Sequence, residues 1–154
     1  MINISRRAVL VGFSALGVVS QLGGSLAADA RAAGDKRVAL SGHDPVSYFD
    51  PGRPEKGSAE FSAGYDAVTY WFKNPEHRAL FVADPDHYAP QFSAYCAIGL
   101  ARGEKVQPDP EAFVIADGKL YVFGKKTGPT LFAEQTTGIV QKATQNWQEV
   151  RRHP

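Results

Sequence analysis

Hydrophobic and polar positions alternate along two pairs of short segments in the middle of the chain. Apolar side chains recur at every second position over residues 61–65 and 68–72, which is the period of a half-buried β-strand. Two further apolar runs, 112–115 and 120–123, flank Asp117-Gly118, a strong hairpin signal. We therefore expect two β-hairpins. In the first one, Ala67 is a poor turn residue, because a tight turn of this kind prefers glycine there.

A helix is predicted directly after the first hairpin. Asn74 can cap its first turn, Pro75 fits the first helical position, and Glu76 suits the positive end of the helix dipole. We expect this helix to end at Asp84-Pro85, because a proline does not continue a helix, and a short turn to follow it. Near the start of the folded region, residues 38–40 suggest a short strand.

The C-terminal region carries the pattern of another helix. Ile139, Ala143 and Trp147 share one helical stripe, and Thr136 or Thr137 is the expected cap.

Residues 91–101 are apolar and small, and their pattern leaves open whether they form a helix or a buried strand. No internal repeat and no low-complexity tract is evident. These elements predict an α+β fold: a small single domain with two β-hairpins, short helices and a C-terminal helix around an aromatic core.

The first ~30 residues have the features of a targeting segment. Arg6-Arg7 precedes a moderately apolar stretch, small residues around Ala27 offer cleavage sites, and no acidic residue occurs before Asp29. The segment is similar to a twin-arginine (Tat) signal, which implies export of a folded protein by the Tat machinery to the periplasm or beyond. We place a cleavable segment at 1–32 and the folded domain at 33–154.

Two other interpretations of this segment stay open: an ordinary secretory signal, and a retained membrane anchor. The apolar stretch is shorter than the ~18 residues that a spanning helix needs, and it is rich in glycine. No later segment is apolar enough to span a bilayer, so we expect no membrane span in the mature protein.

Composition excludes several classes of function. The formal net charge is +1, and removal of Arg6 and Arg7 with the signal leaves a nearly neutral domain, without the basic patch that nucleic-acid binding requires. Cys96 is the only cysteine, so neither an internal disulfide nor a four-cysteine zinc site is possible within one chain. A Cys96 bridge between two copies, giving a homodimer, stays open.

Four stretches of the chain carry recognisable motifs. They are Leu-Ser-Gly-His-Asp-Pro-Val-Ser-Tyr-Phe at 40–49, Tyr-Trp-Phe at 70–72, Phe-Val-Ala-Asp-Pro-Asp-His-Tyr-Ala-Pro-Gln at 81–91 with Tyr-Cys-Ala at 95–97, and Asp-Gly-Lys-Leu-Tyr at 117–121. Their order and spacing resemble the YHS domain family over roughly residues 38–147. The family's metal-associated members carry cysteines that are thought to bind metal. At those positions this chain has Ser47, Lys73 and, approximately, His77, of which only His77 readily coordinates a metal.

Cys96 is the sharpest candidate for chemistry. It is interpreted either as a small buried hydrophobe or as a reactive thiol or metal ligand. Together with His43 or His77 it would form a set suited to copper or zinc, with copper favoured by the family resemblance. Asp44, which precedes a proline, fits a structural role as a turn or cap residue better than catalysis.

Three hypotheses about function follow. The first is non-enzymatic metal binding or handling, of the copper type. The second is a module that binds a small molecule or a protein in an aromatic pocket; a core without a cavity beside Cys96 would argue against it. The third is a thiol-dependent redox protein that uses Cys96. No catalytic residues are assigned, because the chain carries no hydrolase, phosphate-loop or dinucleotide motif.

Overall fold

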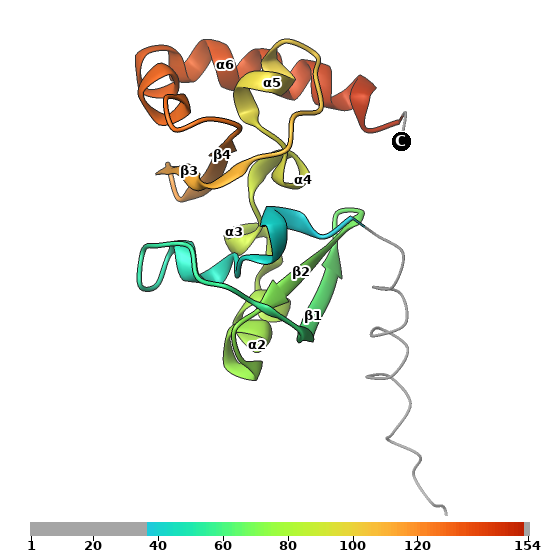
Figure 1. Ribbon diagram of the computed structural model, residues 1–154. Coiled ribbons are helices and arrows are strands. Elements are labelled where there is room, and N and C mark those ends of the chain that lie inside the picture. Colours follow the sequence, from blue (N-terminus) through green and yellow to red (C-terminus); the bar gives the residue numbers. More distant parts are fainter. Residues whose placement is uncertain (1–36, 153–154) are drawn as a thin grey trace, which may run out of the picture.

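Two antiparallel hairpins organise the computed structural model, which describes residues 37–152 (Figure 1). In the first hairpin, β1 (Ser58–Tyr65) pairs with β2 (Val68–Phe72); in the second, β3 (Asp109–Ala116) pairs with β4 (Lys119–Phe123). Both predicted hairpins and the α+β fold class are confirmed. The predicted targeting segment lies outside the described residues.

Short helical elements precede the hairpins, and longer helices follow them. The predicted cap of α2 is confirmed, because the Asn74 side chain accepts a hydrogen bond from the His77 backbone N–H at 2.8 Å. No helix of residues 37–152 is long and apolar enough to cross a membrane. The helical elements are η1 (Ala39–Gly42), η2 (Val46–Tyr48), α2 (Pro75–Ala83), α3 (Pro85–Tyr88), α4 (Gln91–Ala94), α5 (Ala97–Ala101) and α6 (Gly128–Val150).

The predicted strand at residues 38–40 is wrong. Val38 forms one isolated bridge with Thr69, and the backbone then turns because Leu40 and Ser41 adopt left-handed conformations with φ of 54° and 51°. The undecided region 91–101 forms the two short helices α4 and α5. Within α4, Phe92 has a left-handed conformation as well.

The C-terminal helix begins earlier than predicted. It starts at Gly128, and the expected cap, Thr136 or Thr137, lies inside it, so that prediction is wrong. Gln135 interrupts the helix with a φ of −137°, and the Thr136 hydroxyl donates to the Phe132 carbonyl at 2.8 Å. The sequence signal for a helix start therefore coincides with a break within one long helix.

The two halves of the domain repeat one order of elements. The first half (residues 38–83) contains η1, η2, β1, β2 and α2; the second half (residues 91–150) contains α4, α5, β3, β4 and α6. β1 and β3 have 8 residues each, β2 and β4 have 5, and both hairpins shift register after their first pair. This correspondence overturns our interpretation of the sequence as free of repeats.

Aromatic side chains make the same contacts in both halves. In the first half, Phe81 of α2 packs on Tyr70 and Phe72 of β2, with ring centroids 4.9 and 5.0 Å apart. In the second half the corresponding distances are 4.9 and 5.3 Å. The equivalent residues, at the same spacing along the chain, are Phe132, Tyr121 and Phe123.

Backbone hydrogen bonds identify a further equivalent pair, which matters for the site. The Asp44 N–H donates to the Glu55 carbonyl at 2.8 Å, and the Cys96 N–H donates to the Val106 carbonyl at 2.9 Å. Each residue follows a left-handed turn and precedes a short helix. Asp44 and Cys96 therefore occupy the same place in the two halves.

The halves share a core and form one domain. Buried residues of the first half make one hydrophobic cluster, which Leu120 and Val122 of β4 join from the second half. The Tyr48 hydroxyl also donates across the halves to the Pro110 carbonyl at 3.0 Å. A second cluster, which includes Cys96 and Phe132, lies within the second half.

Candidate functional site

Asp44 is the centre of a buried polar network in the first half. Its side chain is 0% exposed. Oδ1 accepts the Val46 N–H at 2.9 Å, and Oδ2 accepts the Lys73 N–H at 3.0 Å and the His77 ring at 2.7 Å. The predicted structural role of Asp44 is confirmed, because its carboxylate holds the start of η2, the end of β2 and a helix side chain together.

His77 is positioned by this network. A carboxylate only accepts hydrogen bonds, so the Nδ1 atom of His77 carries the proton of their hydrogen bond, and its Nε2 is left for another partner. The ring is 12% exposed. Close by, the Lys73 ammonium donates to Glu55 at 2.6 Å, and this hydrogen bond holds the pKa of Glu55 below its ordinary value of 4.5.

His43 lies on the other side of Asp44 in the sequence. Its Nδ1 donates to the Leu40 carbonyl at 2.9 Å, across the left-handed turn of η1. The ring therefore supports a local turn, with its second nitrogen uncommitted by that hydrogen bond.

Cys96 is separated from both histidines. Its thiol accepts the Gly99 N–H at 3.3 Å and so caps α5, and the residue is 6% exposed. Within residues 37–152, no hydrogen bond or ion pair joins Cys96 to His43 or His77, and no three His, Cys, Asp or Glu residues form a group that could hold a metal ion. The metal set of Cys96, His43 and His77 stays a prediction.

A cavity of about 410 Å³ lies beside Cys96, and we call it the Cys96 pocket. Val106, Phe123 and Leu131 contribute to its apolar wall, and Ile98 of α5 lies along it. The sequence did not predict these lining residues. Since only one of them is aromatic, this is not the aromatic-lined pocket that the second hypothesis expected.

The lining of the pocket differs from the corresponding place in the first half, where the His77 ring contacts Asp44. By the register of the aromatic contacts, the counterpart of His77 is Gly128 and that of Lys73 is Gly124, and both glycines line the pocket. Where the His77 ring meets Asp44, the second half has open space next to Cys96. The repeated spacing of Tyr70, Phe72 and Phe81 in the second half was the sequence signal that could have shown this.

Close packing explains both glycines. A Cβ on Gly128 would lie 2.3 Å from the Cβ of Phe123, and one on Gly124 would lie 2.9 Å from a methyl group of Val106. Both distances are shorter than van der Waals contact allows, so a side chain at either position would force its neighbours to move.

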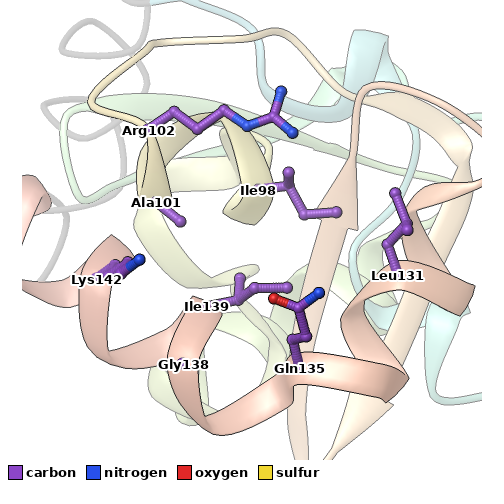
Figure 2. A pocket seen from close by; sticks show the side chains of 8 residues that line it. All are labelled: Ile98, Ala101, Arg102, Leu131, Gln135, Gly138, Ile139 and Lys142. Atoms are coloured by element: carbon purple, nitrogen blue, oxygen red, sulfur yellow. The ribbon is translucent and has the colours of Figure 1, made fainter.

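A second cavity of about 230 Å³, which we call the α5–α6 groove, adjoins the Cys96 pocket (Figure 2). The two share the lining residues Ile98, Arg102 and Leu131. Figure 2 shows Ile98, Leu131 and Ile139 converging on the space between the two helices. We call the two adjoining cavities together the depression along α5.

A different cavity has three aromatic residues in its lining. Tyr65, Phe92 and Trp147 surround a space of about 350 Å³, with Asp66 and Asp86 at its edge. The Tyr65 hydroxyl donates to Asp86, and this hydrogen bond raises the pKa of Tyr65 to about 12. Asp66 in turn accepts the Ser93 hydroxyl at 2.6 Å. The polar groups here are largely satisfied by one another.

Comparisons with protein-family models, with curated proteins and with solved structures gave no match to this chain. The functions proposed below are therefore based on the geometry of the described residues and on the motifs in the sequence.

Proposed function

We propose that this protein is an exported, YHS-like binding module without catalytic activity, and that the Cys96 pocket is its site for a small organic molecule. The observation that carries the proposal is the cavity itself, which lies beside Cys96, the residue equivalent to Asp44 of the first half. Its volume of about 410 Å³ falls in the range of ~300–1,000 Å³ that small-molecule sites occupy.

The lining supports a binding role. Apolar side chains form the wall, while Thr127 and charged residues supply polar groups at the edge, a combination that orients a ligand and excludes water from it. The buried Cys96 side chain adds a soft, polarisable surface to this wall.

Binding of the neutral dye N-phenyl-1-naphthylamine to the full chain tests this function. Leu131 lines the pocket and is 44% exposed, so Leu131→Trp should fill the mouth and weaken dye binding about tenfold or more, the equivalent of ~1.4 kcal/mol. Leu80→Trp is the matched control, because Leu80 is 48% exposed and lines none of the cavities described above. Equal binding by both variants would refute the pocket as the ligand site.

Metal handling is the second candidate, and the Asp44–His77 hydrogen bond favours it. Histidines that bind metals commonly donate their other ring N–H to a carboxylate, as His77 does here at 2.7 Å. Copper or zinc would then bind at Nε2, with His43 or Cys96 as the further ligands that the sequence predicts.

Titration with Cu(I), Cu(II) and Zn(II), of the wild type beside His77→Gln and Cys96→Ala, tests this candidate. Stoichiometric binding that both substitutions weaken would support the predicted set. If the folded protein binds none of these ions more tightly than about micromolar, metal handling is excluded. A micromolar Kd corresponds to a binding free energy of about −8 kcal/mol.

Export to the periplasm by the Tat machinery remains part of the proposal, supported by Arg6-Arg7 and the apolar stretch after them. Replacement of both arginines by lysine should retain the precursor inside the cell, as seen by fractionation. Unchanged export would favour an ordinary secretory signal.

A further inference from the structure

The depression formed by the α5–α6 groove and the Cys96 pocket has an uneven distribution of charge. Arg102, Lys125 and Lys142 line it, against the single carboxylate of Glu104. None of these four side chains takes part in an ion pair among residues 37–152. The depression therefore presents an excess of positive charge to whatever enters it.

Its floor is apolar and open. Ile98, Leu131 and Ile139 converge in the groove, and Gly138 lies at its α6 edge (Figure 2). A Cβ on Gly138 would meet nothing within 4 Å, so a larger side chain has room at this edge. The interruption of α6 at Gln135 falls in the same wall.

An elongated apolar floor with unpaired cations at its edge suits a molecule with a hydrocarbon chain and one negative group. We propose that the ligand of this site is a free medium-chain aliphatic carboxylate, with its chain along the groove and its carboxylate at Arg102. This inference rests on the proposed function and specifies its ligand class. Arg102 belongs to both cavities, and a guanidinium matches a carboxylate with two parallel hydrogen bonds.

The third cavity described above, which also has charged residues at its edge, is less suited to a charged ligand. In the cavity around Trp147, Asp66 is bonded to Ser93 and lies 3.8 Å from Arg151, while Asp86 accepts the Tyr65 hydroxyl. Their charges are already engaged within the protein. In the depression along α5, by contrast, three cations face a single carboxylate.

Three ten-carbon probes test the inference by isothermal titration of the full chain, below their critical micelle concentrations. These are decanoate, decanol and decyltrimethylammonium, which differ in head-group charge. We expect decanoate to bind about tenfold more tightly than either of the others, as one charge-assisted contact should give. Arg102→Gln should remove that preference and leave decanol binding unchanged.

Substitutions at two neighbouring residues of α6 test where the hydrocarbon chain of the ligand lies. Gly138→Leu places a side chain at the α6 edge of the groove and should weaken decanoate and decanol alike, about tenfold. Thr137→Leu is the matched control, because Thr137 is exposed on the same helix outside the groove and should leave binding as in the wild type. Thermal melts of each variant confirm that the fold is retained.

The results separate this inference from the proposed function. If the neutral dye responds to Leu131→Trp while the three ten-carbon probes bind equally, the pocket stands and the carboxylate ligand is overturned. If neither Gly138→Leu nor Arg102→Gln changes the affinity for decanoate, the carboxylate ligand is overturned as well. If neither the dye nor any probe binds, the proposed function fails together with it.

Discussion

The two halves of this domain use one architecture for different purposes. Asp44 and Cys96 occupy the same place, after a left-handed turn and before a short helix, and make the same backbone hydrogen bond. In the first half the side chain is a carboxylate with three hydrogen-bond donors, one of them from His77. In the second half it is a thiol with one donor and a cavity beside it.

In this fold, the polar network that stabilises the domain is therefore in one half, and the pocket proposed for binding is in the other. A buried carboxylate is favourable only when its partners are all present, so the first half tolerates little change around Asp44. A thiol needs no such network, and a cavity lies next to it. The following predictions test that separation.

The largest effects should come from the aromatic residues that the halves have in common. Phe81→Ala and Phe132→Ala each remove a ring that is 1% exposed; the Phe81 ring packs on three other rings and the Phe132 ring on two, so each loss should cost about 3–5 kcal/mol in the free energy of unfolding. Urea denaturation measures both. A difference of more than about 2 kcal/mol between them would show that the halves are not energetically equivalent, as the context dependence of such losses is of that size.

Truncation of the capping residues should distinguish the halves. Asp44→Ala leaves two backbone N–H groups and His77 without their acceptor, and we expect a loss of about 3–5 kcal/mol. Cys96→Ala removes one weak hydrogen bond next to a cavity and should cost only about 1 kcal/mol. Equal losses in the same denaturation experiment would contradict the assignment of stability to the first half.

The smallest effects concern two glycines of α6. Gly128→Ala places a Cβ against Phe123 and should destabilise the protein by about 1–3 kcal/mol. Gly138→Ala meets free space in a helix interior and should stabilise it by about 0.5–1 kcal/mol. Melting temperatures that shift in opposite directions would support the close packing at Gly128. A neutral Gly128→Ala would show that α6 can move away from β4.

Local patterns in the sequence were sufficient for the hairpins and for α2. Alternation defines the strands, and Asn74-Pro75 starts the helix through its own side chains. A tight turn of this kind prefers glycine at the position of Ala67. Ala67 nevertheless adopts a φ of 63°, similar to the φ of 71° of Gly118 in the second hairpin. The strand pairing and the packing around that turn outweigh the local preference of one residue.

The left-handed turns and the start of α6 could not be predicted in this way. Leu40 and Phe92 have side chains that ordinarily avoid positive φ, and their conformation is explained by tertiary packing: Leu40 is buried in the first cluster and Phe92 packs against the second. At Gly128, close contact with Phe123 makes the glycine necessary, and that contact spans two elements. The sequence at that point shows only a glycine before a proline.

The candidate site was found in part. Cys96 was selected as the only cysteine, and a cavity does lie beside it, but the residues that line this cavity were not predicted. The glycines at the positions of Lys73 and His77 become visible only when the two halves are compared position by position. The metal set joined residues of different halves, because sequence spacing says nothing about which cluster a side chain enters.

The repeated architecture also has a consequence for redesign and for evolutionary change. Since the Asp44 network lies in the first half, substitutions at Arg102, Lys125 and Leu131 can alter the pocket without disturbing that network. All three residues are exposed. A library confined to these positions should therefore retain folded members at high frequency, which makes the second half a natural place for a lineage, or an engineer, to exchange one ligand for another.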